Sequence, residues 1–304
     1  MERVAEFDKL LDAASYDLSS GDYHRHIEKL SAPLAERAVA LGGLEQGQRV
    51  LDVGTGGGIA ARYAARKVGP SGFVLGVDLS EGMLEVAKSA SRQQRLTNIE
   101  FQRMDAEALD LPDESFDAVM SFFAVSHFPN IGTALAEMTR VLKRGHRLVV
   151  ATGYGRPPLG YGLIRYAVGR GLGRLRPFLK PQRRAPDMIL SLIARRIPEV
   201  AEPDEADWQR GDPTVRLVEF ARAAGLREIE TSWHGHVLTF EDAADYWEAQ
   251  AAISTLARKR LLTLEPNRVA QLRGEFLAEA ERVLESGGKL YYPYGAFYVT
   301  GIRT

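Results

Sequence analysis

A glycine-rich loop constrains the fold of this chain more than any other feature. It follows the strand candidate 49–53, whose apolar run into Asp52 is typical of a buried parallel strand. Its alternate glycines, which let a backbone turn tightly beneath a ligand, are Gly54, Gly56 and Gly58. The next strand candidate, 72–77, ends at Asp78, where a carboxylate can accept hydrogen bonds from both hydroxyls of a ribose. The spacing therefore predicts a pocket for a nucleotide cofactor.

The residues after the glycines distinguish between the known nucleotide-binding motifs. A dinucleotide fingerprint G-x-G-x-x-G/A that starts at Gly54 needs a small residue at position 59, where Ile59 stands. A phosphate-binding P-loop needs Lys-Ser or Lys-Thr after its glycines, and neither pair follows here. The sequence therefore disfavours an NAD-dependent oxidoreductase and a P-loop protein.

Strand and helix patterns alternate through the first half of the chain. The strand candidates are 49–53, 72–77, 99–103, 116–121 and 147–152. The helix candidates between them are 57–68, 81–91 and 131–142. This alternation predicts a parallel sheet with right-handed crossovers, and ligands of such sheets bind beyond the carboxyl ends of the strands.

The second half of the chain returns to the same pattern after an irregular segment. Asp212-Pro213 is typical of a helix start, and Gly225 of its stop, so we expect a helix from Pro213 to Ala224. Strands are predicted near 227–238 and 290–302. Between them, the apolar spacing of 240–286 favours helices that cover the sheet.

Four segments resemble, in order, the motifs of class I S-adenosylmethionine-dependent methyltransferases, especially the ubiquinone/menaquinone-methyltransferase-like branch. They are Asp52–Gly58, Gly76–Leu84, Asp105–Glu107 with Leu111-Pro112 and Ser115–Asp117, and Ala134–Leu142. The resemblance covers roughly residues 45–152. It departs at Lys143-Arg-Gly-His146, where the family usually has a Pro and a Gly-Gly turn.

The resemblance and the alternation together predict an α/β fold. We expect a Rossmann-like, seven-stranded, mostly parallel sheet flanked by helices, with a mainly helical cap or lid. The predicted division is a helical arm (1–45), a cofactor-binding core (46–152), a basic lid insertion (153–211), a core helix and strand (212–239), a helical cap (240–288) and a final core strand (289–304).

The resemblance implies S-adenosylmethionine as cofactor and S-adenosylhomocysteine as product. It places the glycine loop against the methionine moiety, Asp78 at the ribose, Leu79 and Met83 on one adenine face, and Asp105 with Ala106 at the adenine edge. The full set of cofactor candidates is Asp52, Gly54, Thr55, Gly56, Gly58, Asp78, Leu79, Met83, Asp105, Ala106, Ser121 and Phe122. Asp105 can instead be a helix cap or lie in a solvated turn, but its position after the third strand favours a functional role.

The implied chemistry is attack of an acceptor oxygen, nitrogen or carbon on an activated methyl group, so alignment is the main catalytic contribution. A hydroxyl or an enolisable carbon also needs a base, and His127 after the fourth strand is the first candidate. His127 can instead cap the next helix or pack against Phe128. The arm offers Tyr16, Tyr23, His24 and His26, which are surface residues of a helix or contributors to the acceptor site.

Composition limits the other function classes. The 304 residues carry a net charge of −1 and contain no cysteine, which excludes disulfides and thiolate zinc sites and gives no global drive toward nucleic acid. His234 and His236 share one face of a predicted strand without an identifiable third ligand, so we predict no metal. No run of about 18 apolar residues occurs, and we expect a soluble cytoplasmic protein.

One segment departs from the neutral composition. Residues 156–196 hold ten Lys or Arg against the single acid Asp187. Such a segment suits a mobile lid for an acidic or amphiphilic acceptor, a surface that touches anionic lipid transiently, or a partner for the acidic stretch 199–207.

The sequence thus predicts a methyltransferase for a small, hydrophobic acceptor such as a quinone, polyketide or other secondary metabolite. The alternative is a protein of the same fold that binds S-adenosylmethionine for regulation or for a non-methylating reaction. The identity of the acceptor and the oligomeric state stay open, because fold does not settle substrate.

Overall fold

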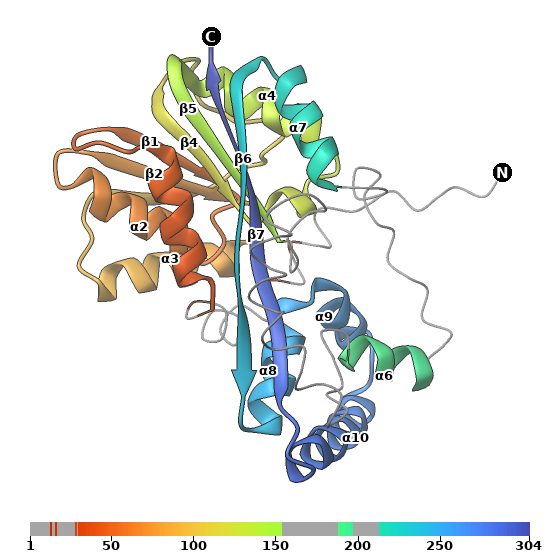
Figure 1. The fold of residues 1–304 in the computed structure, drawn as a ribbon. Helices are drawn as coiled ribbons and strands as arrows, with labels where there is room; N and C mark the ends of the chain where they lie inside the picture. Colours follow the sequence, from red (N-terminus) through yellow and green to blue (C-terminus); the bar gives the residue numbers. More distant parts are fainter. Residues whose placement is uncertain (1–12, 14–15, 17–27, 29, 154–187, 197–212) are drawn as a thin grey trace. The chain divides into compact units, whose positions relative to one another are not determined.

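A seven-stranded sheet forms the centre of the fold, in a computed structural model that describes residues 13, 16, 28, 30–153, 188–196 and 213–304 (Figure 1). Its strands follow the order β3-β2-β1-β4-β5-β7-β6. They are β1 (Arg49–Val53), β2 (Phe73–Asp78), β3 (Ile99–Arg103), β4 (Phe116–Phe122), β5 (Leu142–Gly153), β6 (Leu226–Phe240) and β7 (Leu290–Arg303). The predicted fold class, a Rossmann-like and mostly parallel sheet, is confirmed.

Strand directions place the binding edge of the sheet. The pairs β1–β2, β2–β3, β1–β4 and β4–β5 are parallel, whereas β5 and β7 are antiparallel. The helices that connect the parallel strands are α2 (Ile59–Val68), α3 (Glu81–Gln93) and α4 (Ile131–Val141). Because crossovers are right-handed and the strand order reverses between β1 and β4, α4 covers the face opposite α2 and α3. A ligand crevice is expected at that reversal.

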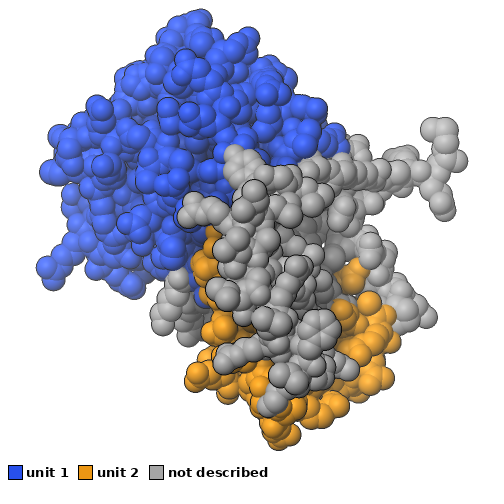
Figure 2. All heavy atoms as spheres, viewed as in Figure 1, with its two compact units in different colours: residues 1–154, 204–234, 296–304 blue, residues 155–203, 235–295 orange. Residues whose placement is uncertain are grey.

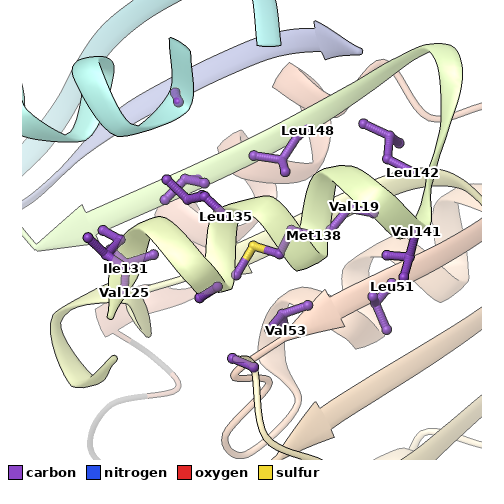
Figure 3. Packing of buried hydrophobic residues seen from close by; sticks show 14 of the residues in the cluster. Leu51, Val53, Val119, Val125, Ile131, Leu135, Met138, Val141, Leu142 and Leu148 are labelled. Carbon is purple, nitrogen blue, oxygen red and sulfur yellow. The ribbon is translucent and has the colours of Figure 1, made fainter. Parts of the chain in front are cut away.

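A large apolar cluster lies under α4 (Figure 3). Figure 3 shows Leu135 and Met138 of this helix together with Val119 of β4, and all three side chains are fully buried. Leu51 and Val53 of β1 belong to the same cluster. Burial of this apolar stripe holds β1 and β4 in place, and the carboxyl ends of these two strands flank the crevice.

Several element boundaries differ from the sequence-based expectation. The helix expected over 131–142 ends at Val141, and β5 begins at Leu142 rather than at 147, because Leu142 pairs with Phe116. The register then shifts before Ala118 pairs with Arg147, and Gly145 between these pairs has φ +75°. The motif departure at 143–146 thus lies at a register shift between β4 and β5. The first predicted helix begins at Ile59, not at 57, because the glycine turn extends through Gly58.

The chain divides into two compact units (Figure 2). Unit 1 comprises 1–154, 204–234 and 296–304, and unit 2 comprises 155–203 and 235–295. In unit 1, α7 (Pro213–Ala223) ends before Gly225, as predicted. In unit 2, the predicted helical excursion is helical: α8 (Ala243–Ile253), α9 (Thr255–Leu262) and α10 (Pro266–Glu285).

Unit 2 has an apolar core of its own. Tyr246 and Trp247 of α8 contact Phe276 of α10, with ring centroids 5.6 and 5.1 Å apart. Helix α6 (Met188–Arg196) joins this cluster through Ile189 and Ile193. No helix among the described residues is long and apolar enough to cross a membrane. The predictions for the rest of the basic segment, for His24, His26 and Tyr23, and for Asp212 lie outside the described residues.

Candidate active site

A cavity lies at the carboxyl ends of the parallel strands in unit 1. Its empty space amounts to about 1110 Å³, which includes a part that is open to solvent. Its lining includes nine predicted cofactor residues and the predicted base: Gly54, Thr55, Gly56, Asp78, Leu79, Met83, Asp105, Ala106, Phe122 and His127. The remaining residues of the lining include Ala13, Tyr16, Glu28, Ser31, Ser80, Met104, Glu107, Phe123 and Phe128.

Backbone hydrogen bonds fasten the glycine loop to β2. The N–H groups of Gly54 and Thr55 both donate to the Val77 carbonyl, at 2.8 and 2.9 Å. Gly54, Gly56 and Gly58 all have positive φ, between 51° and 76°. A Cβ at Gly56 would stand 3.4 Å from Cε of Met83, which also lines the cavity. The glycine positions of the loop thus form a cradle without side chains.

Gly54→Ala is expected to destabilise unit 1, because the new Cβ would lie 2.2 Å from Cβ of Ala124 at φ +69°. Gly145→Ala is a matched control, since Gly145 has φ +75° but open space around the Cβ position. The control isolates backbone strain of about 1–2 kcal/mol. Chemical denaturation should show a larger loss of unfolding free energy for Gly54→Ala than for Gly145→Ala. Equal losses would mean that the contact with Ala124 is unimportant.

Asp78 joins the loop to the start of α3. One carboxylate oxygen accepts from the Gly56 N–H at 2.8 Å, and the other accepts from the Ser80 N–H at 3.0 Å. Burial raises the pKa of Asp78, while these two hydrogen bonds act in the opposite direction. Ser80 is the N-cap of α3, and its hydroxyl accepts from the N–H of Met83, which sets that side chain at the cavity. A carboxylate with spare acceptor capacity thus faces the cavity.

The loop after β3 forms a second wall. The Asp105 carboxylate accepts from the Glu107 N–H at 3.0 Å and so caps the turn after β3. Asp105 also lines the cavity, so the two predicted roles are compatible. Glu107 in turn accepts from the backbone N–H of Asn130, at the start of α4, at 2.9 Å. These bonds connect the loop to the segment that carries His127.

His127 lies in η1 (Val125–His127), the single turn after β4. Its Nε2 lies 3.0 Å from the hydroxyl of Tyr16, and the two rings meet edge to face with centroids 5.3 Å apart. Tyr16 and His127 are 111 residues apart in the chain. Two potential proton carriers therefore line one side of the cavity.

A partly buried ion pair anchors the N-terminal segment to the glycine loop. Arg62 of α2 is 1% exposed, and its guanidinium donates to the Gly57 carbonyl and, at 2.7 Å, to a carboxylate oxygen of Glu28. Burial lowers the pKa of Arg62, and Glu28 opposes this effect. Glu28 and Gly57 both line the cavity, so the ion pair sets part of its wall.

Three predicted cofactor residues lie outside the cavity lining: Asp52, Gly58 and Ser121. Gly58 is the N-cap of α2, and a Cβ there would lie 2.9 Å from Ala87 and 3.0 Å from Phe101, so the glycine permits close packing of helix and sheet. The buried hydroxyl of Ser121 has no hydrogen-bond partner in the described structure.

Asp52 is 1% exposed and accepts a hydrogen bond from the Thr55 hydroxyl at 2.8 Å. Its second carboxylate oxygen is buried with no partner in the described residues. Burial raises the pKa of Asp52 from 3.8 to about 6, and the Thr55 hydrogen bond only partly offsets this effect. A buried carboxylate without full pairing destabilises the fold once it ionises.

Asp52→Asn is expected to increase stability at pH 7 and to change it little at pH 4. The folded protein holds the Asp52 proton more tightly than the unfolded chain, so stability falls as the pH rises from 3.8 through about 6. The gain at pH 7 is at most about 3 kcal/mol. Urea denaturation of both proteins at the two pH values measures it. A gain of equal size at pH 4 would contradict this assignment.

Two residues of the cavity carry no sequence signal. Glu28 and Ser31 lie in the N-terminal segment with no motif around them. Met104 and Phe128 could have been expected at the cavity, because they are the sequence neighbours of Asp105 and His127. No three His, Asp or Glu side chains in the described part of the chain gather as metal ligands. His236 contacts Tyr294 edge to face instead, and burial lowers its pKa.

Comparisons with known proteins agree with this geometry. The family described as methyltransferase domain matches residues 50–145. Aklanonic acid methyltransferase DauC of Streptomyces sp. (strain C5) is 31% identical over 220 residues, which cover 70% of this chain and 92% of that protein. The ubiquinone/menaquinone biosynthesis C-methyltransferase UbiE of Pseudomonas entomophila is 38% identical over 143 residues. That match covers 45% of this chain and about half, 53%, of the relative.

Solved structures share the fold. The 4+2 cyclase SpnF superposes with a TM-score of 0.58 at 18% identity, over 97% of this chain and 96% of that protein. This likeness concerns the fold alone. The match to aklanonic acid methyltransferase extends over most of both chains and goes beyond the cofactor-binding core. The chain belongs to the class I S-adenosylmethionine-dependent methyltransferases.

Proposed function

We propose that the cavity of unit 1 binds S-adenosylmethionine together with a small, hydrophobic methyl acceptor. The residues present fit the cofactor: the side-chain-free cradle at Gly56 leaves room for the methionine moiety, and the Asp78 carboxylate suits the two ribose hydroxyls. Leu79 and Met83 offer an apolar wall for the adenine, and Asp105 an acceptor for its amino group.

When bound there, S-adenosylmethionine supplies a methyl group to the acceptor's electron pair while the carbon–sulfur bond breaks and its electrons stay on sulfur. The leaving group needs no proton, so the protein contributes alignment and removal of the acceptor proton. Tyr16 and His127 are placed for the second task. As the Tyr16 hydroxyl accepts the acceptor's proton, it can pass its own proton to Nε2 of His127, 3.0 Å away, so that the imidazole ends protonated.

The observation that carries this proposal is the Tyr16–His127 contact in the same cavity as Asp78 and the glycine loop. A proton carrier is useful for a hydroxyl or an enolisable carbon, and unnecessary for a neutral amine. We therefore infer that the methylated atom is oxygen or carbon. Phe122, Phe123 and Phe128 make the nearby wall apolar, which supports a hydrophobic acceptor.

Label transfer tests the proposal. The protein is incubated with methyl-deuterated S-adenosylmethionine and fractionated small-molecule extracts, and products are searched by mass spectrometry for a gain of one labelled methyl group. We expect a labelled phenol ether or a C-methylated product, whose formation requires His127. A product labelled on an amine, or labelling at an equal rate in His127→Ala, would contradict the proposed role of the Tyr16–His127 pair.

A further inference from the structure

Phe123 has an unusual backbone conformation for an aromatic residue. It has φ +60°, and only three other non-glycine residues of the described chain have positive φ: Arg95, Glu114 and Glu228. Those three are exposed polar residues, whereas Phe123 is half-buried and lines the cavity. Such a conformation costs free energy and persists only where surrounding contacts hold it.

The positive φ has a definite consequence for the cavity. Successive side chains of an extended strand point to opposite faces, so Phe122 at the end of β4 and the next residue would normally diverge. Instead, both rings line the cavity and stack on each other with centroids 4.2 Å apart and an interplanar angle of 27°. The Phe123 N–H donates to the Ala151 carbonyl at 2.8 Å, which fixes the turn to β5.

The stacked pair stands next to the proton carrier in the chain. Ala124 follows Phe123 directly, and η1 with His127 follows Ala124. An acceptor whose reacting atom lies at the Tyr16–His127 contact therefore has an aromatic wall beside it. Aromatic rings prefer offset-stacked or edge-on contact with other flat π-systems, and this preference exceeds what their buried area alone provides.

We propose that Phe123 is a specificity-determining residue whose ring, supported by Phe122, stacks against a flat aromatic or quinonoid ring of the acceptor. The acceptor class is thus a planar ring that bears an ionisable hydroxyl group. This inference rests on the proposed function, because it places the acceptor in the same cavity as the cofactor. It accounts for the backbone strain, which brings two adjacent rings to one cavity.

Calorimetry on the protein saturated with S-adenosylhomocysteine tests the ring contact. The probes are 2-hydroxy-1,4-naphthoquinone, which is flat and ionisable, and 2-decalol, which has the same two-ring carbon frame but is not flat. We expect Phe123→Leu to weaken naphthoquinone binding by about 2- to 12-fold and to leave decalol binding within twofold. Phe123→Tyr, which keeps the ring, should retain the naphthoquinone affinity.

Phe220→Leu is the matched control, because Phe220 of α7 packs against the main core and does not line the cavity. Affinity for S-adenosylhomocysteine reports on the fold of each variant. The proposal is overturned if wild-type protein does not bind the naphthoquinone, or if Phe123→Leu binds it as tightly as wild type. Naphthoquinone binding that depends on Phe123, without label transfer to any acceptor, would instead count against the proposed methyl transfer.

A second pair of variants tests the strain. Phe123→Ala and Phe123→Gly both remove the ring, but only glycine adopts φ +60° freely. We expect the glycine variant to melt at a higher temperature than the alanine variant, and both to lose the preference for the naphthoquinone. A higher melting temperature for Phe123→Ala would show that the backbone at this position is not strained.

Discussion

Asp78→Ala should weaken binding of S-adenosylmethionine by about 100-fold or more. The carboxylate is the acceptor placed for the two ribose hydroxyls, and each hydrogen bond to a charged group contributes about 1.5–3 kcal/mol. The same change removes the acceptor for the N–H groups of Gly56 and Ser80, so the loop and the start of α3 lose their connection. Isothermal titration calorimetry of the purified variants measures the effect.

Two controls accompany this prediction. Asp78→Asn retains one acceptor oxygen and should lose less affinity than the alanine variant. Asp110→Ala removes an exposed carboxylate outside the cavity and should bind the cofactor as wild type does. A folded Asp78→Ala protein with unchanged affinity would mean that the cofactor binds elsewhere.

His127→Ala should lower kcat by about 10²- to 10⁴-fold, the range typical of a lost general base. The cofactor affinity should change little, because the candidate ribose and adenine residues lie on other loops. Stopped-time assays with the acceptor identified by label transfer, at saturating concentrations of both substrates, measure kcat.

Two further variants accompany this prediction. Tyr16→Phe tests the contact with His127, and His146→Ala controls for the loss of a histidine outside the cavity. Tyr16→Phe removes the hydroxyl that meets Nε2 of His127, and we expect a fall in kcat of about 5- to 10-fold, as for one lost hydrogen bond. His146 bonds the Asp117 carbonyl at 2.8 Å, away from the cavity, and its replacement should leave kcat unchanged. Equal activity of His127→Ala and wild type would remove His127 from the mechanism.

Local features of the fold and site could be predicted from the sequence. The first strand, the glycine loop and Asp78 lie close together in the sequence. Each could be predicted because its residue types favour the conformation that they adopt. The helix stop at Gly225 and the helical excursion in unit 2 have equally local signals. The start of β5 does not, because pairing of Leu142 with Phe116 decides it. That pairing depends on sheet register rather than on helix propensity.

Contacts between distant segments account for most of what could not be predicted. Tyr16 meets His127 and Glu28 meets Arg62 only in the folded chain, and no spacing rule connects such positions. Ser121 and Phe122 were both expected at the cofactor, but neighbours on a strand point to opposite faces, and only Phe122 lines the cavity. Phe123 breaks that rule through a backbone angle that the sequence does not reveal.

Hydrogen–deuterium exchange with and without S-adenosylmethionine tests most directly whether the cavity of unit 1 is the cofactor site. The full-length protein is compared with and without saturating cofactor, and peptides are followed by mass spectrometry. We predict slower exchange in peptides that cover 54–60, 78–83 and 104–107, three segments that line the cavity. Unchanged exchange in all three, together with calorimetric evidence of binding, would contradict the assignment.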